Sequence, residues 1–262
     1  MVISAKGFTY DGKSSDDFGL IICEFSNSGS SDSSGGQIEF AKISTPIQNR
    51  WYKTGNANYS EALQFEFEVA KSNFEKIDTY EYSAISRWLV KKDDYKDFMI
   101  IRTDYDNIHF YAQMNTSPIE ISGSIYGIKI TGICDSPFGY NQLIEKEFVG
   151  CGEYIIIDTS DEIGYIYPDI EINVNSACDI KIINETDKRE FFIKDCVPNE
   201  VITINGRYLT ISTTALLHNI HDCINYKFPR IVNDYNKRKN IFKIEGDCTV
   251  KMQYRPIRKV VI

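Results

Sequence analysis

Short segments in which apolar and polar residues alternate recur along the whole chain, and they restrict it to a mainly β fold. The clearest spans residues 63–69, where leucine, phenylalanine and valine alternate with glutamine and glutamate. Because successive side chains of a strand point to opposite faces, one face of this segment should pack on a core and the other should contact water. Asn205-Gly206 separates two more such segments, 201–204 and 208–211. This pair favours a two-residue turn that matches strand twist, so we expect a tight hairpin there.

One segment has the period of a helix instead. Within residues 78–91, apolar side chains recur three and four positions apart, and Trp88 is the largest of them. Asp78 or Thr79 can act as the N-cap, and Glu81 follows early in the first turn, which is typical of a helix start. We therefore expect one helix at about 78–91, with Trp88 as the core residue that anchors it to a sheet.

A turn-rich segment at residues 135–141 predicts a domain boundary. Residues 1–137 combine strands with the single helix and contain a loop rich in serine and glycine at 26–36. Residues 138–262 show strand-like segments at the spacing of a β-sandwich and no helical period of similar strength. The expected fold class is mainly β, with an α+β N-terminal domain followed by an all-β sandwich.

Charge and hydropathy disfavour several classes of function. The chain has 262 residues and a net charge of −8, which argues against a general nucleic-acid binder. It has no run of 18 apolar residues and no secretion signal, so we expect no membrane-spanning helix and folding in a cytosol. Ten Lys and Arg residues against three acids lie within 227–262. This segment is either a solvated strand edge protected by lysines or a docking surface for an acidic partner or a neighbouring subunit.

Seven cysteines are widely spaced and include no Cys-x-x-Cys pair: Cys23, Cys134, Cys151, Cys178, Cys196, Cys223 and Cys248. A disulfide framework or a zinc site typically has closer spacing. We expect free thiols, mostly buried, that pack as small apolar side chains.

Histidine is the scarcest candidate for chemistry, with three residues in the chain. His218 and His221, with Asp222 beside the second, can share one face of a short turn and hold a metal. A turn across the end of a sandwich explains these residues as well, and no third ligand lies at a sequence spacing typical of a metal site. His109 lies in an alternating segment, and we expect its ring on the solvent face.

No catalytic motif is present. The acid-rich pieces 104–106 and 158–162 lack the regular spacing of a calcium loop, and we expect solvated turns. The sequence contains no serine elbow, phosphate loop or dinucleotide fingerprint, and nothing selects a glycosidase pair among its 37 acids. The residues therefore favour a scaffold or binding protein that is not an enzyme, with no cofactor, no metal and no catalytic residue.

Four parts of the chain, in order, resemble the distal tail protein (Dit) family of long-tailed bacteriophages. The first contains a Phe–Gly-Leu pair just after the first hairpin, the second a helix that ends in Trp-Leu, and the third the junction of the family's two domains. They lie at residues 8–21, at 85–90 with 94–98, at 134–140, and at 228–232 with 240–246 and 250–256. Residues 44–59 follow the family pattern only loosely.

The resemblance implies an N-terminal β domain (1–137) that assembles into a homohexameric ring and a galectin-like β-sandwich (138–262) that projects outward. It implies a structural role as a hub that links the tail tube to the tail tip or baseplate around a DNA channel. The partners it implies are the major tail tube protein, the tail-associated tip protein and the tape-measure protein. The implied location is the virion tail tip, after assembly in the host bacterial cytoplasm.

A carbohydrate-binding module is the alternative function, in which the C-terminal sandwich contacts a saccharide of the host surface as galectins do. Such a site combines an aromatic platform with clustered polar side chains. Tyr165, Tyr167, Asn173 and Asn175 supply fragments of this set, although not on one strand face. A shared fold is only an analogy for function. A hydrolase of the tail tip is a third reading, for which the sequence shows no site.

Overall fold

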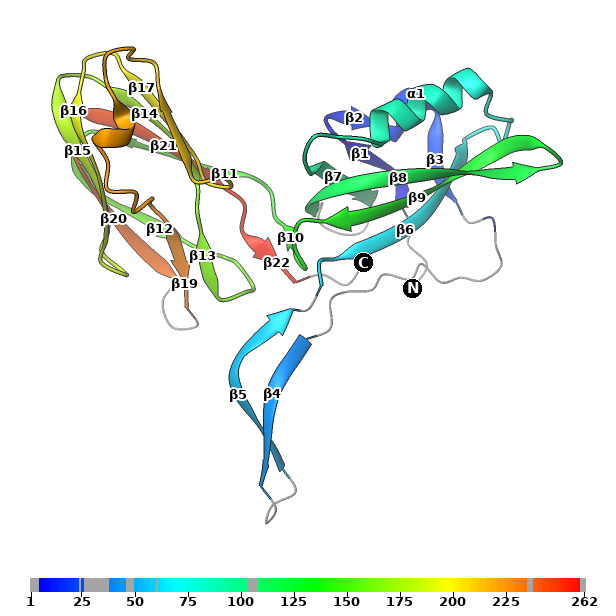
Figure 1. Ribbon diagram of the computed structural model, residues 1–262, viewed down its shortest axis with the longest axis horizontal. Helices are drawn as coiled ribbons and strands as arrows, with labels where there is room; N and C mark the ends of the chain where they lie inside the picture. Colours follow the sequence, from blue (N-terminus) through cyan, green and yellow to red (C-terminus); the bar gives the residue numbers. More distant parts are fainter. Residues whose placement is uncertain are drawn as a thin grey trace. The chain divides into compact units, whose positions relative to one another are not determined.

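The computed structural model describes residues 5–23, 25, 38–45, 50–59, 61–102, 108–234 and 238–259. The chain divides into two compact units, residues 1–140 with 259–262 and residues 141–258 (Figure 1). Antiparallel strands dominate both units, and the described residues contain one α-helix, so the mainly β fold class is confirmed. Within the described residues, no helix is long and apolar enough to cross a membrane.

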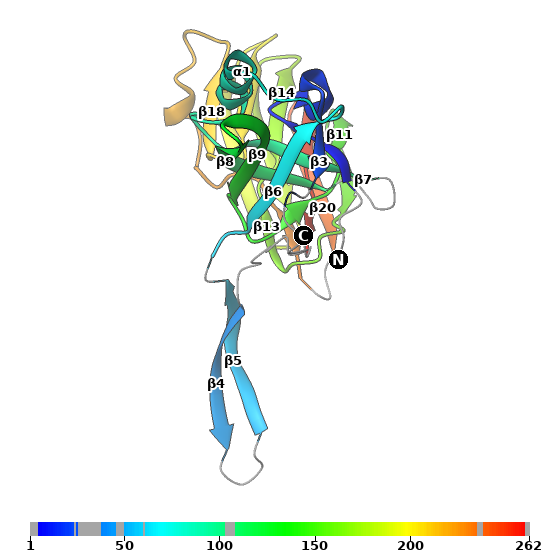
Figure 2. The ribbon, with the colours of Figure 1, turned by 90° about the vertical axis from the view of Figure 1, so that its right-hand side faces the viewer.

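The first unit is built on an antiparallel sheet with the strand order β2-β1-β7-β8-β9-β6-β3. A short strand, β10, pairs with β8, and the β4–β5 hairpin forms a separate two-stranded ribbon (Figure 2). The bounds are β1 (Ala5–Tyr10), β2 (Lys13–Ser14), β3 (Leu20–Cys23), β4 (Ile38–Thr45), β5 (Arg50–Tyr59), β6 (Gln64–Lys71), β7 (Lys96–Arg102), β8 (His109–Ile121), β9 (Ser124–Cys134) and β10 (Gly139–Tyr140), with a 3-10 turn at Ser15–Phe18.

The alternation at residues 63–69 forms strand β6 as predicted. Leu63, Phe65 and Val69 are buried, whereas Gln64 and Glu66 are exposed. One face of the strand therefore lies on the core of the first unit, and the other contacts water.

Helix α1 (Thr79–Leu89) confirms the predicted helix and packs over β8 (Figure 1). Asp78 Oδ1 accepts a hydrogen bond from the Glu81 backbone N–H at 2.8 Å, and Glu81 Oε2 accepts one from the Asp78 N–H at 2.9 Å. This reciprocal pair satisfies two amides that have no partner inside the helix. Trp88, 4% exposed, lies in the core beneath the helix, as expected.

The second unit is a β-sandwich of two antiparallel sheets, with strand orders β11-β21-β14-β17-β18 and β12-β20-β15-β16; β13 pairs with β19 beside them. The bounds are β11 (Ile144–Val149), β12 (Gly152–Ile157), β13 (Gly164–Ile166), β14 (Asp169–Val174), β15 (Cys178–Asn184), β16 (Arg189–Cys196), β17 (Val201–Asn205), β18 (Thr210–Thr213), β19 (Ile231–Asn233), β20 (Lys239–Glu245), β21 (Cys248–Tyr254) and β22 (Ile257–Arg258), with a 3-10 turn at Ile220–Asp222. Isoleucines make up most of its core.

The predicted two-residue turn at Asn205-Gly206 is wrong. Asn205 pairs with Thr210, so four residues connect β17 to β18. Asn205 Oδ1 accepts a hydrogen bond from the Tyr208 N–H at 2.9 Å, and Leu209, rather than Gly206, takes the left-handed conformation with φ of 52°. The asparagine side chain thus stabilises a wider loop than the tight turn that the dipeptide favours.

Gly206 is required for close approach of the backbone. A Cβ atom at this position would lie 2.1 Å from the Tyr167 carbonyl oxygen and 2.6 Å from that of Pro168. We expect Gly206→Ala to destabilise the second unit by about 1–3 kcal/mol, because backbone rather than a flexible side chain must move. Thermal unfolding measures this, with Gly152→Ala as the control, since its nearest neighbour is the Tyr154 ring at 3.3 Å. Equal melting temperatures for the two variants would contradict the steric explanation.

Candidate functional site

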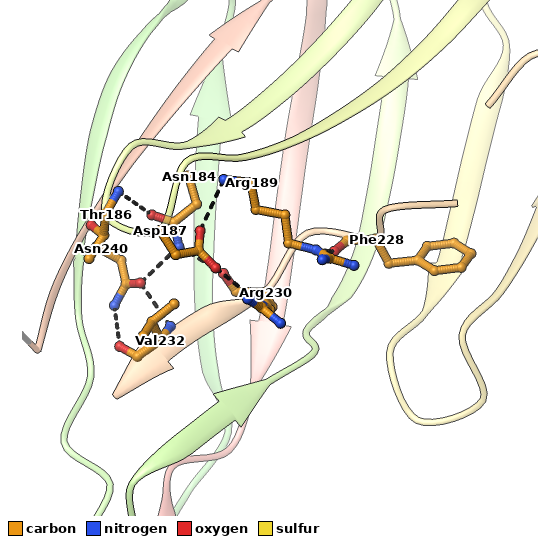
Figure 3. A network of polar contacts seen from close by, with 8 residues as sticks. All are labelled: Asn184, Thr186, Asp187, Arg189, Phe228, Arg230, Val232 and Asn240. Atoms are coloured by element: carbon orange, nitrogen blue, oxygen red, sulfur yellow. Dashed lines mark hydrogen bonds and ion pairs between the residues drawn. The ribbon is translucent and has the colours of Figure 1, made fainter. Parts of the chain in front are cut away.

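A buried polar network lies within the second unit around two asparagines, Asn184 at the end of β15 and Asn240 in β20 (Figure 3). Their exposed fractions are 2% and 0%. Asn184 Nδ2 donates to Asn240 Oδ1 at 2.9 Å and to the Arg230 carbonyl at 2.8 Å, and Asn184 Oδ1 accepts from the Thr186 N–H at 3.0 Å. Both amides are therefore hydrogen-bonded, which removes the main cost of burying them.

The side-chain amide of Asn240 takes the place of a backbone peptide group in pairing with strand β19. Its Oδ1 accepts from the Val232 N–H at 2.8 Å, and its Nδ2 donates to the Val232 carbonyl at 2.9 Å. An antiparallel backbone pair exchanges the same two bonds. Asn240 thereby joins strand β19 to the four-stranded sheet.

Charged residues extend this network toward the surface. Arg230 Nε donates to Asp187 Oδ2 at 2.8 Å, and its guanidinium carbon lies 3.6 Å from the centre of the Tyr165 ring. Arg189 Nε donates to the Phe228 carbonyl at 2.8 Å (Figure 3). Together with the asparagines, these contacts fasten residues 228–232 to β15 and β20, which is a structural role.

The four candidate saccharide residues are not brought together. Tyr165 has Arg230 stacked on its ring. Tyr167 and Asn175 flank opposite ends of β14, and eight extended residues span roughly 25 Å. Asn173 projects from the same strand and donates to a neighbouring glutamate. Tyr167 and Asn175 are therefore too far apart to contact the same sugar ring.

Glu200 and His218 form a second buried polar centre. The side chain of Glu200 is fully buried and accepts hydrogen bonds from His218 Nδ1 at 2.6 Å, from the Val197 N–H at 2.9 Å and from Thr213 Oγ1. Burial raises the pKa of Glu200, but the hydrogen bonds outweigh it and hold the pKa below its usual value. The carboxylate therefore joins three segments around β17 and β18.

His218 and His221 do not form the metal site that their spacing allowed. His218 is turned inward to Glu200 with 3% of its side chain exposed, whereas His221 is exposed. Across the described ranges, no group of three or more histidine, cysteine or acidic side chains is arranged to hold a metal ion.

The prediction for His109 is wrong in part: the ring lies on the face of β8 opposite the buried Phe110 and Ala112, as expected, but it is covered rather than solvated. Its side chain is 13% exposed, and Nδ1 lies 2.9 Å from Asp97 Oδ1 on the neighbouring strand β7. His109 pairs with Met99, which places Asp97 at a diagonal position within reach of the ring. Alternation along one strand does not reveal such a neighbour.

The expected solvated turn at 158–162 is also wrong in part, because Asp158 and Ser160 are each 1% exposed. Asp158 Oδ1 accepts from Ser160 Oγ at 2.9 Å, and Asp158 Oδ2 is buried without a hydrogen-bond partner. Burial raises the pKa of Asp158, and hydrogen bonds from Ser160 and nearby amides offset only part of this rise. The other acid-rich piece, 104–106, lies outside the described residues.

Replacing Asp158 by asparagine is expected to change how stability depends on pH. Because the pKa is raised, the native state binds the proton on Asp158 more tightly than the unfolded chain does. The stabilisation from this proton is complete below the unfolded pKa of about 3.9 and is lost as pH rises through the native pKa. Asp158→Asn should therefore gain melting temperature relative to the wild type between acid and neutral pH. Asp161→Asn is the control and should lower the melting temperature at neutral pH, because it removes an ion pair with Arg258. A constant difference between Asp158→Asn and wild type at every pH would contradict the assignment.

Several basic residues of the segment 227–262 are matched by acids of the same unit. Lys243 contacts Glu245 at 2.6 Å, Arg258 contacts Asp161 at 3.1 Å, and Arg230 pairs with Asp187. These three ion pairs fit the interpretation of a solvated strand edge.

All seven cysteines are free thiols. Cys134, Cys196 and Cys248 are buried, and burial raises the pKa of each to about 12. These three are therefore protonated at neutral pH and pack as apolar side chains, as expected. The expectation that most of the cysteines are buried is wrong, because Cys23, Cys178 and Cys223 are only half-buried. Cys151 differs, because it is exposed.

Comparison with known proteins places both units in one family. A model described as the phage tail protein N-terminal domain matches residues 3–136, and one described as the phage tail C-terminal domain matches residues 138–254. The chain belongs to this family of phage tail proteins. No curated protein matches it.

Solved structures of phage tail components share the fold of this phage tail protein. It is similar to phage SPP1 Dit, whose structure is described as a paradigm of the hub adsorption apparatus in phages that infect Gram-positive bacteria: TM-score 0.59 and 13% identity, covering 95% of this chain and 98% of that one. It is also similar to chains of the phage p2 baseplate in its activated conformation with Sr (TM-score 0.57, 10% identity, 95% and 97% covered) and with Ca (0.54, 11%, 92% and 91%). The resemblance to the Dit family is confirmed at the level of the fold.

Proposed function

We propose that this protein is the distal tail hub of its phage, a homohexameric ring that links the tail tube to the tail tip or baseplate around the DNA channel. The observation that carries the proposal is the shared fold with SPP1 Dit over 95% of the chain, together with the family match. The role is structural and needs no catalytic residue. Its partners are the major tail tube protein, the tail-associated tip protein and the tape-measure protein.

In this proposal residues 1–137 form the ring and residues 138–262 form a galectin-like sandwich that projects outward. Large apolar side chains exposed on the first unit support the assignment of the ring contacts. Phe74 is 67% exposed and Tyr80 is 87% exposed, both near the start of helix α1. Exposed aromatic residues are typical of protein interfaces. The ring assembles in the host cytoplasm and remains at the virion tail tip.

The mass of the purified full chain in solution, with negative-stain images of the same fraction, tests the ring. We expect particles of six times the 30.1 kDa chain mass with a central hole. Phe74→Ser and Tyr80→Ser should shift the mass toward the monomer, whereas Tyr208→Ser, at a 54% exposed position of the second unit, should not. A monomer across the whole concentration series, or a closed ring of another symmetry, would contradict the hexamer.

The separation of Tyr167 and Asn175 at opposite ends of β14 does not favour the alternative of a saccharide site.

A further inference from the structure

Four of the seven cysteines gather at one end of the sandwich in the second unit. Cys151 lies in the turn between β11 and β12, Cys178 begins β15, Cys196 ends β16, and Cys248 begins β21. Cys196 is close enough to Cys178 and Cys248 for the ionised forms to repel one another. This cluster is the largest group of nucleophilic side chains that the proposed hub function leaves unused among the described residues.

Within the cluster, Cys178 and Cys196 stand directly opposite each other on paired antiparallel strands. The Cα atoms of such a pair are about 4.5–5.5 Å apart, which lies inside the range of about 4.4–6.8 Å that disulfides require. Opposed residues also point to the same face of a sheet. Both side chains here lie on the core side, since Cys196 is 2% exposed and Cys178 packs half-buried against the same core.

A β-bulge produces this alignment. The register shifts between Cys178 and Ile180, so that two residues of β16 oppose one residue of β15. Asp195 takes φ of 58°, and its N–H donates to Asp179 Oδ1 at 3.0 Å. The bulge brings Cys196 back into register with Cys178.

We propose that Cys178 and Cys196 are an oxidation site that closes to a cross-strand disulfide when the protein leaves a reducing cytosol. The oxidant is a low-molecular-weight disulfide. The Cys178 thiolate attacks one of its sulfurs, forming a mixed disulfide and releasing one small thiol. The Cys196 thiolate then attacks the Cys178 sulfur and releases the second small thiol. Two protein thiols are oxidised while one small disulfide is reduced to two thiols.

The two cysteines have different parts in this reaction. Cys178 is half-buried and can be reached first, whereas Cys196 is buried and acts as the resolving thiol. Because burial raises the pKa of Cys196 to about 12, the second step is the slow one and should accelerate at alkaline pH. The product would fasten β16, the last strand of its four-stranded sheet, to β15.

Oxidised glutathione is the probe, applied to the reduced, folded full chain, with intact mass and peptide mapping as the readout. We expect the loss of two hydrogens, a peptide pair that joins Cys178 to Cys196, and a rise in melting temperature on the order of 10 °C for the second unit. Cys178→Ser and Cys196→Ala should each abolish the linked peptide. Cys223→Ser, at another half-buried cysteine of the same unit, should retain it.

Three outcomes would overturn the proposal. They are a bond from Cys178 to Cys248 or Cys151, glutathione retained on Cys178 without closure, and no reaction at either residue in the folded chain. Circular dichroism of the reduced variants establishes that each is folded before oxidation, and Cys178→Ala replaces Cys178→Ser if the latter is not.

Discussion

Replacing Glu200 by alanine is expected to destabilise the second unit strongly, because each buried donor left without its acceptor costs about 1–3 kcal/mol. The carboxylate is fully buried, and its removal leaves His218, Thr213 and the Val197 N–H without their acceptor. Hydrogen exchange measured by mass spectrometry should show lost protection in β17 and β18. Glu171→Ala, at an exposed position of the same sheet, is the control and should have little effect.

The contribution of Glu200 also depends on pH with a definite sign. Because its pKa is lowered in the native state, the stabilisation is present above the unfolded pKa of about 4.3 and is lost as pH falls through the native pKa. The difference between wild type and Glu200→Gln should therefore shrink under acid conditions. Two results would contradict this explanation. Glu200→Ala could be as stable as Glu171→Ala, or the stability difference between wild type and Glu200→Gln could grow toward acid pH.

Trp88→Ala is expected to destabilise the first unit by about 3–5 kcal/mol. Its ring stacks on Phe18 at 4.7 Å and on Phe8 at 5.5 Å between centroids, and Nε1 donates to the Tyr10 carbonyl at 2.8 Å. Removing it opens a cavity beneath helix α1 and leaves a buried carbonyl without this donor. The free energy of unfolding, from denaturant titration followed by circular dichroism, measures the loss.

Trp88→Phe separates packing from hydrogen bonding. It keeps an aromatic ring in the stack but loses the N–H, so its cost should be the smaller one, about 1–3 kcal/mol. Hydrogen exchange should locate both losses in the first unit and leave the sandwich protected. Equal costs for the two variants would show that the stacking is not what holds the helix.

The sequence predicted those elements whose pattern is local. The strand at 63–69 and the helix that starts after Asp78 carry their period and their cap within a few residues, so the local sequence was enough to predict them. The mainly β class followed from many such segments. The resemblance to the Dit family then predicted how the strands are arranged within each domain, which their periodicity alone does not give.

The wrong predictions share a physical cause, because each depends on a residue distant in sequence or on the register of a partner strand. His109 is covered through Asp97 on the next strand, and Asp158 is buried by the segments packed around it. The loop after Asn205 is set by its pairing with Thr210 rather than by the dipeptide alone.

The buried asparagines carried a signal that strand parity alone could have revealed. Asn240 shares its face of β20 with Phe242 and Ile244, and Asn184 shares its face of β15 with Ile180 and Ile182. A polar residue on an otherwise apolar face predicts a satisfied amide in the core. Glu200 gave no such signal, because it lies in a turn before β17.

The central claim is that this phage tail protein is the hub at the distal end of the tail. Gold-labelled antibodies against the chain, applied to virions that carry it and viewed by negative-stain electron microscopy, test the claim most directly. We expect label at the distal end of the tail, where tube and tip meet. Label along the length of the tube or at the head would contradict the claim. So would the absence of label from intact virions that contain the protein.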